Sequence, residues 1–195
     1  MKHGGYNYYG LLSAVLPMNS FALFTDVSLN PILKLGVGCY LLVPDSFLEV
    51  PPQNIERTEL AVRLHQHRFE TASSAELEVR TALWAFEDCR DILKASSPLK
   101  LRLYTDSQCI AGLLKRRAGL EAGKFLSRKT NLLLKNASLY RKFYEFHDKM
   151  GFEVAKVKGH TRSCSRDTVD IIFSFIDREA RKSLKLWMNE FESKY

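Results

Sequence analysis

In the stretch KLRLYTDSQCIAGLL, residues 100–114, two predicted elements meet without a linker. Its apolar, strand-like run LRLYT stops at Asp106 and passes directly into a segment with helical character. This order indicates a β-α-β crossover, in which the strand joins its sheet in parallel. Asp106 or Ser107 can start the helix, because a side-chain oxygen there accepts the free N–H groups of the first turn. An acid at the end of a strand can also belong to a metal site, and the stretch alone leaves both interpretations open.

The segments before this stretch predict three strands and a helix. The strand-like runs are 21–25, 35–43 and 59–70, separated by the turn signals Asn30-Pro31 and Pro51-Pro52, and this order predicts an antiparallel meander. Residues 73–95 then carry apolar side chains at a helical period, and Ser73 or Ser74 can cap that helix.

The segments after it complete an α/β pattern. A helix over 136–150 ends at Gly151, a fifth strand covers 152–159, and a long helix covers 166–191. The whole order predicts an α/β fold with a mixed five-stranded sheet flanked by helices, in which strands 1–3 are antiparallel and strands 4 and 5 run parallel to strand 1. We expect a single domain over 20–195, preceded by an extension over 1–19.

The charge is uneven along the chain. The 195 residues include 29 Lys and Arg against 22 Asp and Glu, a formal charge of +7. Within 113–166 there are 14 basic residues and four acidic ones, a local charge of +10. Such an excess favours an anionic partner, either nucleic acid or a membrane surface.

Cysteine usage and hydropathy narrow the class of protein. The four cysteines contain no C-x-x-C pair, which argues against a zinc site or a disulfide framework and suits the reducing cytoplasm. No apolar run reaches the ~18 residues that a membrane-spanning helix needs. The sequence therefore predicts a cytoplasmic protein with no membrane contact.

Acidic residues stand where the predicted elements meet. Asp26 follows the first strand, Asp106 follows the fourth, and Glu76 and Glu78 open the first helix. Sites in α/β sheets gather at the carboxyl ends of strands, and carboxylates that converge there repel one another unless a divalent cation neutralises them. Oxygen ligands without His or Cys select Mg²⁺ or Mn²⁺. Two such ions ~3.5–4 Å apart can activate water against a phosphodiester, and the basic segment suits that substrate.

Four segments in this order resemble a known family. LFTDVSLNPILKLGVGCYLL, SSAELEVRTALWAF, RLYTDSQCIAGLL and VAKVKGH followed by IDREAR resemble the successive motifs of ribonuclease H, from about Phe21 to about Leu184. NASLYRKFYE, after a basic stretch, resembles the helix that follows the family's substrate-binding protrusion. The resemblance implies a ribonuclease H-like fold and a catalytic site that binds two Mg²⁺ or Mn²⁺ ions.

The resemblance also assigns the site. Asp26 and Asp106 match its first and third acids, and Glu78 matches the helix acid better than Glu76, which would put Arg80 at a buried position. For the last acid it leaves two candidates, seven residues apart on one helical face: Asp177 within the IDREAR pattern, which we prefer, and Asp170. It further implies that His160 assists product departure or proton transfer. The residues it implies for nucleic-acid binding are Ser74, Lys115, Arg116, Arg117, Lys124, Arg128 and Lys129.

Two departures bear on the substrate. Val27 stands where the family has Gly, and Ser73-Ser74-Ala75 stands where it has T-N-N; in the family both positions lie close to the RNA strand and its 2′-hydroxyls. We expect a monomeric endonuclease that cuts the RNA strand of RNA–DNA hybrids and leaves 5′-phosphate ends. The alternatives are a non-catalytic nucleic-acid-binding module on the same fold and a nuclease for branched or structured DNA.

Overall fold

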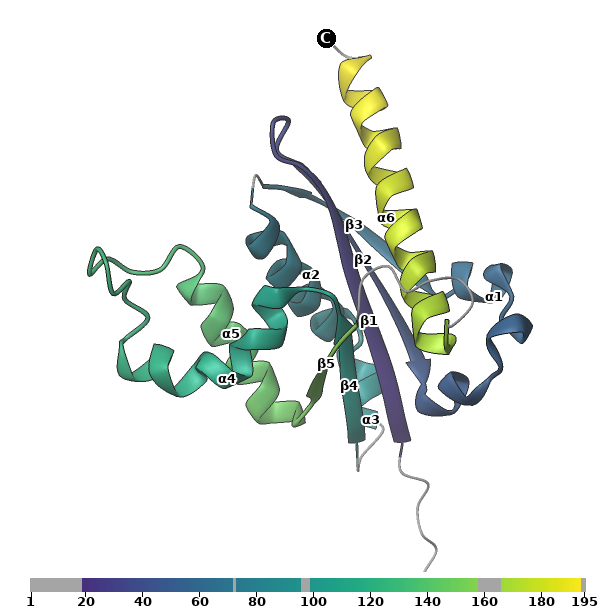
Figure 1. Ribbon diagram of the computed structural model, residues 1–195, viewed down its shortest axis with the longest axis horizontal. Coiled ribbons are helices and arrows are strands. Elements are labelled where there is room, and N and C mark those ends of the chain that lie inside the picture. Colours follow the sequence, from purple (N-terminus) through teal and green to yellow (C-terminus); the bar gives the residue numbers. More distant parts are fainter. Residues whose placement is uncertain (1–18, 72, 96–98, 158–165, 194–195) are drawn as a thin grey trace, which may run out of the picture.

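The computed structural model describes residues 19–71, 73–95, 99–157 and 166–193. A five-stranded sheet runs through its centre in the order β3-β2-β1-β4-β5 (Figure 1). β1 pairs antiparallel with β2 and parallel with β4, β2 pairs antiparallel with β3, and β4 pairs parallel with β5. The predicted mixed sheet is therefore confirmed. The strands are β1 Asn19–Asn30, β2 Leu35–Pro44, β3 Leu64–Glu70, β4 Leu99–Thr105 and β5 Glu153–Lys156.

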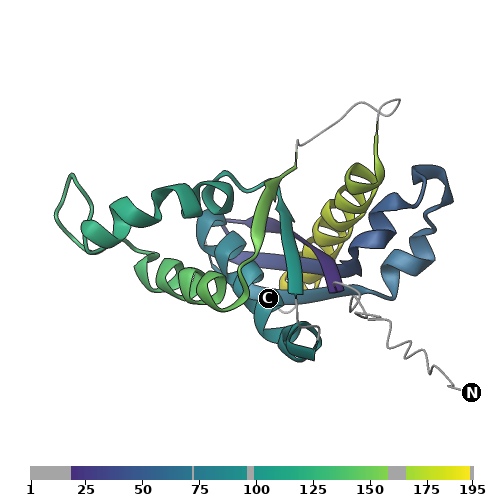
Figure 2. The ribbon, with the colours of Figure 1, turned by 90° about the horizontal axis from the view of Figure 1, so that it is seen from below.

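Helices cover both faces of the sheet. In Figure 2, α4 and α5 lie on one side of β4 and β5, and α6 lies on the other. The predicted helix over 73–95 is divided at Cys89 into α2 and α3. The helices are α1 Arg57–Ala61, α2 Ser74–Asp88, α3 Arg90–Ala95, α4 Gln108–Ala122, α5 Ala137–Met150 and α6 Thr168–Glu192, with 3₁₀ turns η1 Asp45–Glu49 and η2 Pro52–Asn54.

The central strand β1 is buried on both of its faces. Ala22 and Phe24 pack into the core beneath α6, whereas Leu23 packs into the core formed by α2, α4 and α5. This alternation follows from the strand period of two. No helix among the described residues is long and apolar enough to cross a membrane.

Two glycines of β2 bring α2 close to the sheet. A Cβ placed on Gly36 would lie 2.7 Å from a methyl group of Leu77, and one on Gly38 would collide with the side chain of Thr81. Any larger residue would push α2 outward. The G-x-G spacing therefore sets how near α2, and with it Glu78, stands to β1.

Two predicted strands need correction. Residues 57–61 form helix α1, and β3 begins only at Leu64, so the predicted strand 59–70 is too long at its start. Leu60 is buried and Val62 is 83% exposed, whereas alternate residues of a strand would lie on one face, so the predicted apolar face of a strand does not form here. β1 extends to Asn30 rather than ending at residue 25, so Asp26 lies within the strand. Of the predicted extension 1–19, only Asn19 is among the described residues.

Candidate active site

Asp26 and Asp106 lie at equivalent positions of adjacent parallel strands. The pairing of β1 with β4 ends at Phe24 and Tyr104, and each acid comes two residues later. Neighbouring strands stand about 4.8 Å apart, so the two carboxylates emerge side by side where β1 and β4 separate. Beyond this point β1 continues to pair with β2 alone.

Three predicted acids surround one small cleft at this point. Asp26 reaches it from β1, Asp106 from the carboxyl end of β4, and Glu78 from the second turn of α2. We call this the carboxylate cleft. Its lining is Thr25, Asp26, Val27, Glu78, Thr105, Asp106 and Ile110.

The end of β4 is held by its own polar groups. Ser107 donates its N–H to Thr105 Oγ1 at 3.1 Å, and its Oγ accepts the N–H of Ile110 at 3.1 Å. Ser107 is thus the cap of α4, as predicted for one of the two candidates. Because these bonds fix the strand-to-helix turn, Asp106 is presented at its surface.

Asp26 is the most perturbed carboxyl group of the site. It is only 8% exposed, and its pKa is raised from 3.8 to about 7, first by burial and then by the negative charges of Asp106 and Asp177. A hydrogen bond from the Val27 N–H opposes the rise. Opposite it on β2, burial and the charge of Asp26 raise the pKa of Cys39 to about 12. In Asp26, burial and the neighbouring negative charges outweigh the opposing charge of Arg181.

The structure separates the two glutamates of α2. Glu78 lines the carboxylate cleft, where Ser74 donates to its Oε1 at 2.9 Å and Ser107 donates to its Oε2. Glu76 instead forms ion pairs with Arg80 at 3.5 Å and Lys135 at 3.2 Å. Glu78 is therefore available to the cleft, and Glu76 is committed to neighbouring cations.

Both acids of α6 lie on the flank of its buried face. Asp177 pairs with Arg181 at 2.7 Å, and its charge contributes to the raised pKa of Asp26. Asp170 stands two turns earlier, about 10 Å along the helix, where its N–H donates to the capping Asp167 at 2.8 Å. Because the charge of Asp177 acts on Asp26, Asp177 is a better candidate than Asp170 for the fourth acid of the site.

The donor set fits a hard divalent cation. It consists of carboxylate oxygens, and the buried Oγ1 of Thr25 has no hydrogen-bond partner among the described residues. In the described part of the chain, no three His, Cys, Asp or Glu side chains stand close enough to share one ion as they are oriented. Glu78 accepts hydrogen bonds from Ser74 and Ser107, and Asp177 forms an ion pair with Arg181.

The predicted basic residues divide into two groups. Lys115, Lys124, Arg128 and Lys129 are exposed on α4 and the loop that follows it, and Arg116 is exposed while it donates to helix carbonyls. Arg117 pairs with Glu121 at 2.7 Å and with Asp148, and lies 5.1 Å over the ring of Tyr144. The charge of Arg117 is therefore neutralised by Glu121 and Asp148. His160 lies outside the described residues.

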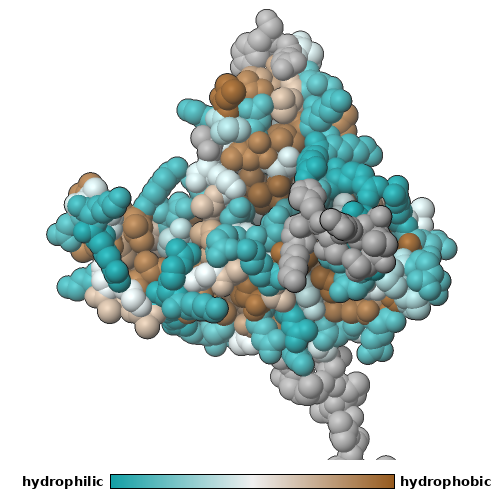
Figure 3. All heavy atoms as spheres, in the orientation of Figure 1, coloured by the Kyte–Doolittle hydropathy of each residue, from teal (hydrophilic) through white to brown (hydrophobic). Residues whose placement is uncertain are grey.

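The loop after α4 is a compact projection. A bridge between Leu126 and Leu133, with bonds from Ser127 N to Leu132 O and from Leu134 N to Phe125 O, closes residues 125–134 into a hairpin. Figure 1 shows it projecting from the body, and Figure 3 shows apolar side chains interleaved with hydrophilic ones there.

Sequence reasoning missed the side chains that hold the acids in place. Ser107 and Arg181 each contact a predicted site carboxylate. The Asp177-Arg181 spacing of four residues on one helix is the signal that could have revealed the second contact. The contact between Ser107 and Glu78 spans 29 residues and leaves no such local signal.

Comparison with known proteins identifies the fold. No family model matches the chain, and no curated protein matches it in sequence. Among solved structures, the PFV RNase H domain superposes with a TM-score of 0.58 at 14% identity, covering 87% of this chain and 95% of that one. LC9-RNase H1, described as a type 1 RNase H with the type 2 active-site motif, gives 0.56 at 16% identity, covering 87% and 75%.

A further solved structure contains nucleic acid. The foamy viral protease-reverse transcriptase in complex with RNA/DNA hybrid gives a TM-score of 0.52 at 10% identity, covering 93% of this chain and 22% of that chain. With the strand order and pairing pattern, these likenesses show that the chain has the ribonuclease H-like fold predicted from its motifs.

Proposed function

We propose that this protein is a metal-dependent endonuclease that hydrolyses the RNA strand of RNA–DNA hybrids. One observation carries the proposal: Asp26, Glu78 and Asp106, from three separate elements, surround one cleft where β1 and β4 separate. The fold supports it, because solved structures of the same fold are ribonuclease H domains. Monomeric state and cytoplasmic location stay predictions.

The four carboxylates Asp26, Glu78, Asp106 and Asp177 would hold two Mg²⁺ or Mn²⁺ ions. When bound, such ions supply an activated water and stabilise the charge on the leaving oxygen, so that products carry 5′-phosphate and 3′-hydroxyl ends. The chain's own part is to present these carboxylates ionised. Asp26, whose pKa stands near 7, must lose its proton for this, and the nearby negative charges oppose that loss until a cation arrives.

The basic side chains of α4 and of the loop that follows it would contact the phosphate backbone of the substrate. Lys115, Lys124, Arg128 and Lys129 are exposed and make no ion pair among the described residues. Such contacts release counterions and make binding depend on salt. His160 keeps its predicted role in product departure or proton transfer.

Two observations favour a second substrate class. The hydroxyl of Ser74, at a position where the family reads RNA, donates to Glu78, and Val27 places a β-branched side chain against the cleft. Both features reduce the groups available to recognise a 2′-hydroxyl. Cleavage of branched or structured DNA is the alternative they support, and binding without cleavage is the other.

A substrate panel decides among these functions. Purified protein with Mg²⁺ is given a labelled hybrid, duplex RNA, duplex DNA and a four-way DNA junction. We expect cleavage of the RNA strand of the hybrid, its loss in Asp106→Asn, and full activity in Asp91→Asn, whose acid is exposed on α3 away from the cleft. Preferential cleavage of the junction would favour the alternative substrate. Tight binding of the hybrid without cleavage, unchanged by Asp106→Asn, would contradict the enzyme proposal.

A further inference from the structure

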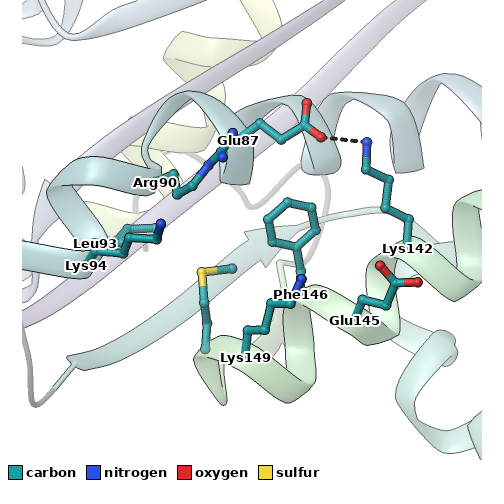
Figure 4. A pocket seen from close by; sticks show the side chains of 9 residues that line it. Glu87, Arg90, Leu93, Lys94, Lys142, Glu145, Phe146 and Lys149 are labelled. Carbon is teal, nitrogen blue, oxygen red and sulfur yellow. Dashed lines mark ion pairs between the residues drawn. The ribbon is translucent and has the colours of Figure 1, made fainter.

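A second cavity, of about 690 Å³, lies between α2, α3 and α5 (Figure 4). We call it the α3/α5 pocket. Glu87 at its edge is nine residues beyond Glu78 on α2, which separates the pocket from the carboxylate cleft by about 13 Å along the helix. Its volume lies in the range of ligand-binding pockets. Nothing in the proposed hydrolysis uses it.

The floor of the α3/α5 pocket is apolar. Leu93 is buried, and Phe146 and Met150 are partly buried against the core. The ring of Phe146 packs on Phe86 at a centroid distance of 5.5 Å, and Figure 4 shows it standing between α2 and α5. An aromatic ring beside a thioether makes an adaptable surface for a bulky apolar side chain.

The rim of the pocket is positively charged. Lys142 is paired with Glu87 at 2.5 Å, but Arg90, Lys94 and Lys149 form no ion pair among the described residues. Four cations against Glu87 and Glu145 leave the lining with a charge of +2. Lys94 and Lys149 stand in the last turns of α3 and α5, where a cation favours the helix dipole. The helix dipole therefore accounts for Lys94 and Lys149. It does not account for Arg90 or for the apolar floor of the pocket.

We propose that the α3/α5 pocket binds an acidic peptide segment of a partner protein, with a bulky apolar side chain of that segment seated on Phe146. The unpaired cations come from α3 on one side of the floor and from α5 on the other, so an extended acidic segment that crosses the floor contacts both. The aliphatic side chains of Leu93 and Met150 in the floor favour an apolar side chain over a phosphate backbone, which distinguishes this ligand from nucleic acid. Because the pocket is remote from the carboxylate cleft, the partner is held while the cleft stays open.

Fluorescence anisotropy with a defined probe tests this proposal. The probe is a fluorescein-labelled peptide of six aspartates followed by two phenylalanines, and its control ends in two serines. The charge reversals Arg90→Glu and Lys94→Glu, made together, remove the rim cations of α3. Lys185→Glu, a single charge reversal at an exposed position of α6 away from the pocket, is the control.

We expect the wild-type protein to bind the phenylalanine peptide at least tenfold more tightly than the serine peptide, and the double variant to lose at least tenfold in affinity. Lys185→Glu should change affinity by less than twofold. Equal binding of both peptides, or equal weakening by the α6 variant, overturns the proposal. So does an eight-nucleotide single strand that binds as tightly as the peptide and depends on the same two cations. Hybrid cleavage by the double variant should match the wild type, so the two proposals can fail independently.

Discussion

Replacing Asp26 with Asn should stabilise the metal-free protein in neutral and alkaline solution. A rise in pKa from 3.8 to about 7 corresponds to ~4 kcal/mol of unfavourable free energy when the buried carboxylate is ionised. Between these two pH values the folded state binds more protons than the unfolded state, so stability falls as pH rises. The penalty is absent below pH 3.8 and complete above about pH 7. The Asn amide has a similar shape but carries no charge, so it does not incur this free-energy penalty.

Chemical denaturation in EDTA, from pH 4 to pH 8.5, measures this effect in both proteins. The stability of Asp26→Asn relative to the wild type should grow with pH and reach about 2–4 kcal/mol above pH 7, the lower value allowing for imperfect hydrogen bonding of the amide. Asp91→Asn serves as control, because its carboxylate is exposed and distant from the cleft. A difference that does not vary with pH, or an Asn variant less stable than the wild type at pH 8, would show that ionised Asp26 does not destabilise the folded protein.

Three further predictions concern individual side chains. Glu78→Gln should lower kcat for hybrid cleavage about a hundredfold or more, whereas Glu76→Gln should lower it less than threefold; equal losses would contradict the assignment. Asp177→Asn should weaken Mg²⁺ binding in calorimetry more than Asp170→Asn, and the reverse order would make Asp170 the fourth acid. Lys129→Ala should reduce the slope of log Kd against log salt by about one, and an unchanged slope would remove this residue from the substrate contact.

The order of elements could be predicted because most boundaries carry local signals. Ser73 and Ser107 cap their helices as expected, and Gly151 ends α5 in a left-handed conformation with φ of 63°. Leu60 and Val62, at alternate positions, led to the wrong prediction of a strand. Helix α1 has five residues and is too short to show a helical period. The break at Cys89 has no Gly or Pro to mark it.

The count of charged residues did not show which basic side chains form ion pairs within the fold. The excess over 113–166 includes Arg117, whose partner Asp148 lies 31 residues away on another helix. Only the packing of α4 against α5 brings these two residues together, whereas the spacing of four residues between Arg117 and Glu121 on one helix is a local signal for the other ion pair of Arg117. The α3/α5 pocket is hidden in the sequence for the same reason, since its lining comes from helices distant in the chain.

Cleavage of a hybrid labelled separately on its RNA and DNA strands tests whether the carboxylate cleft is the active site of a ribonuclease. With Mg²⁺, the wild-type protein should cut the RNA strand alone and leave 5′-phosphate ends, and EDTA should stop the reaction. An intact hybrid under these conditions, or cutting that persists in EDTA or in Asp106→Asn, would contradict the account.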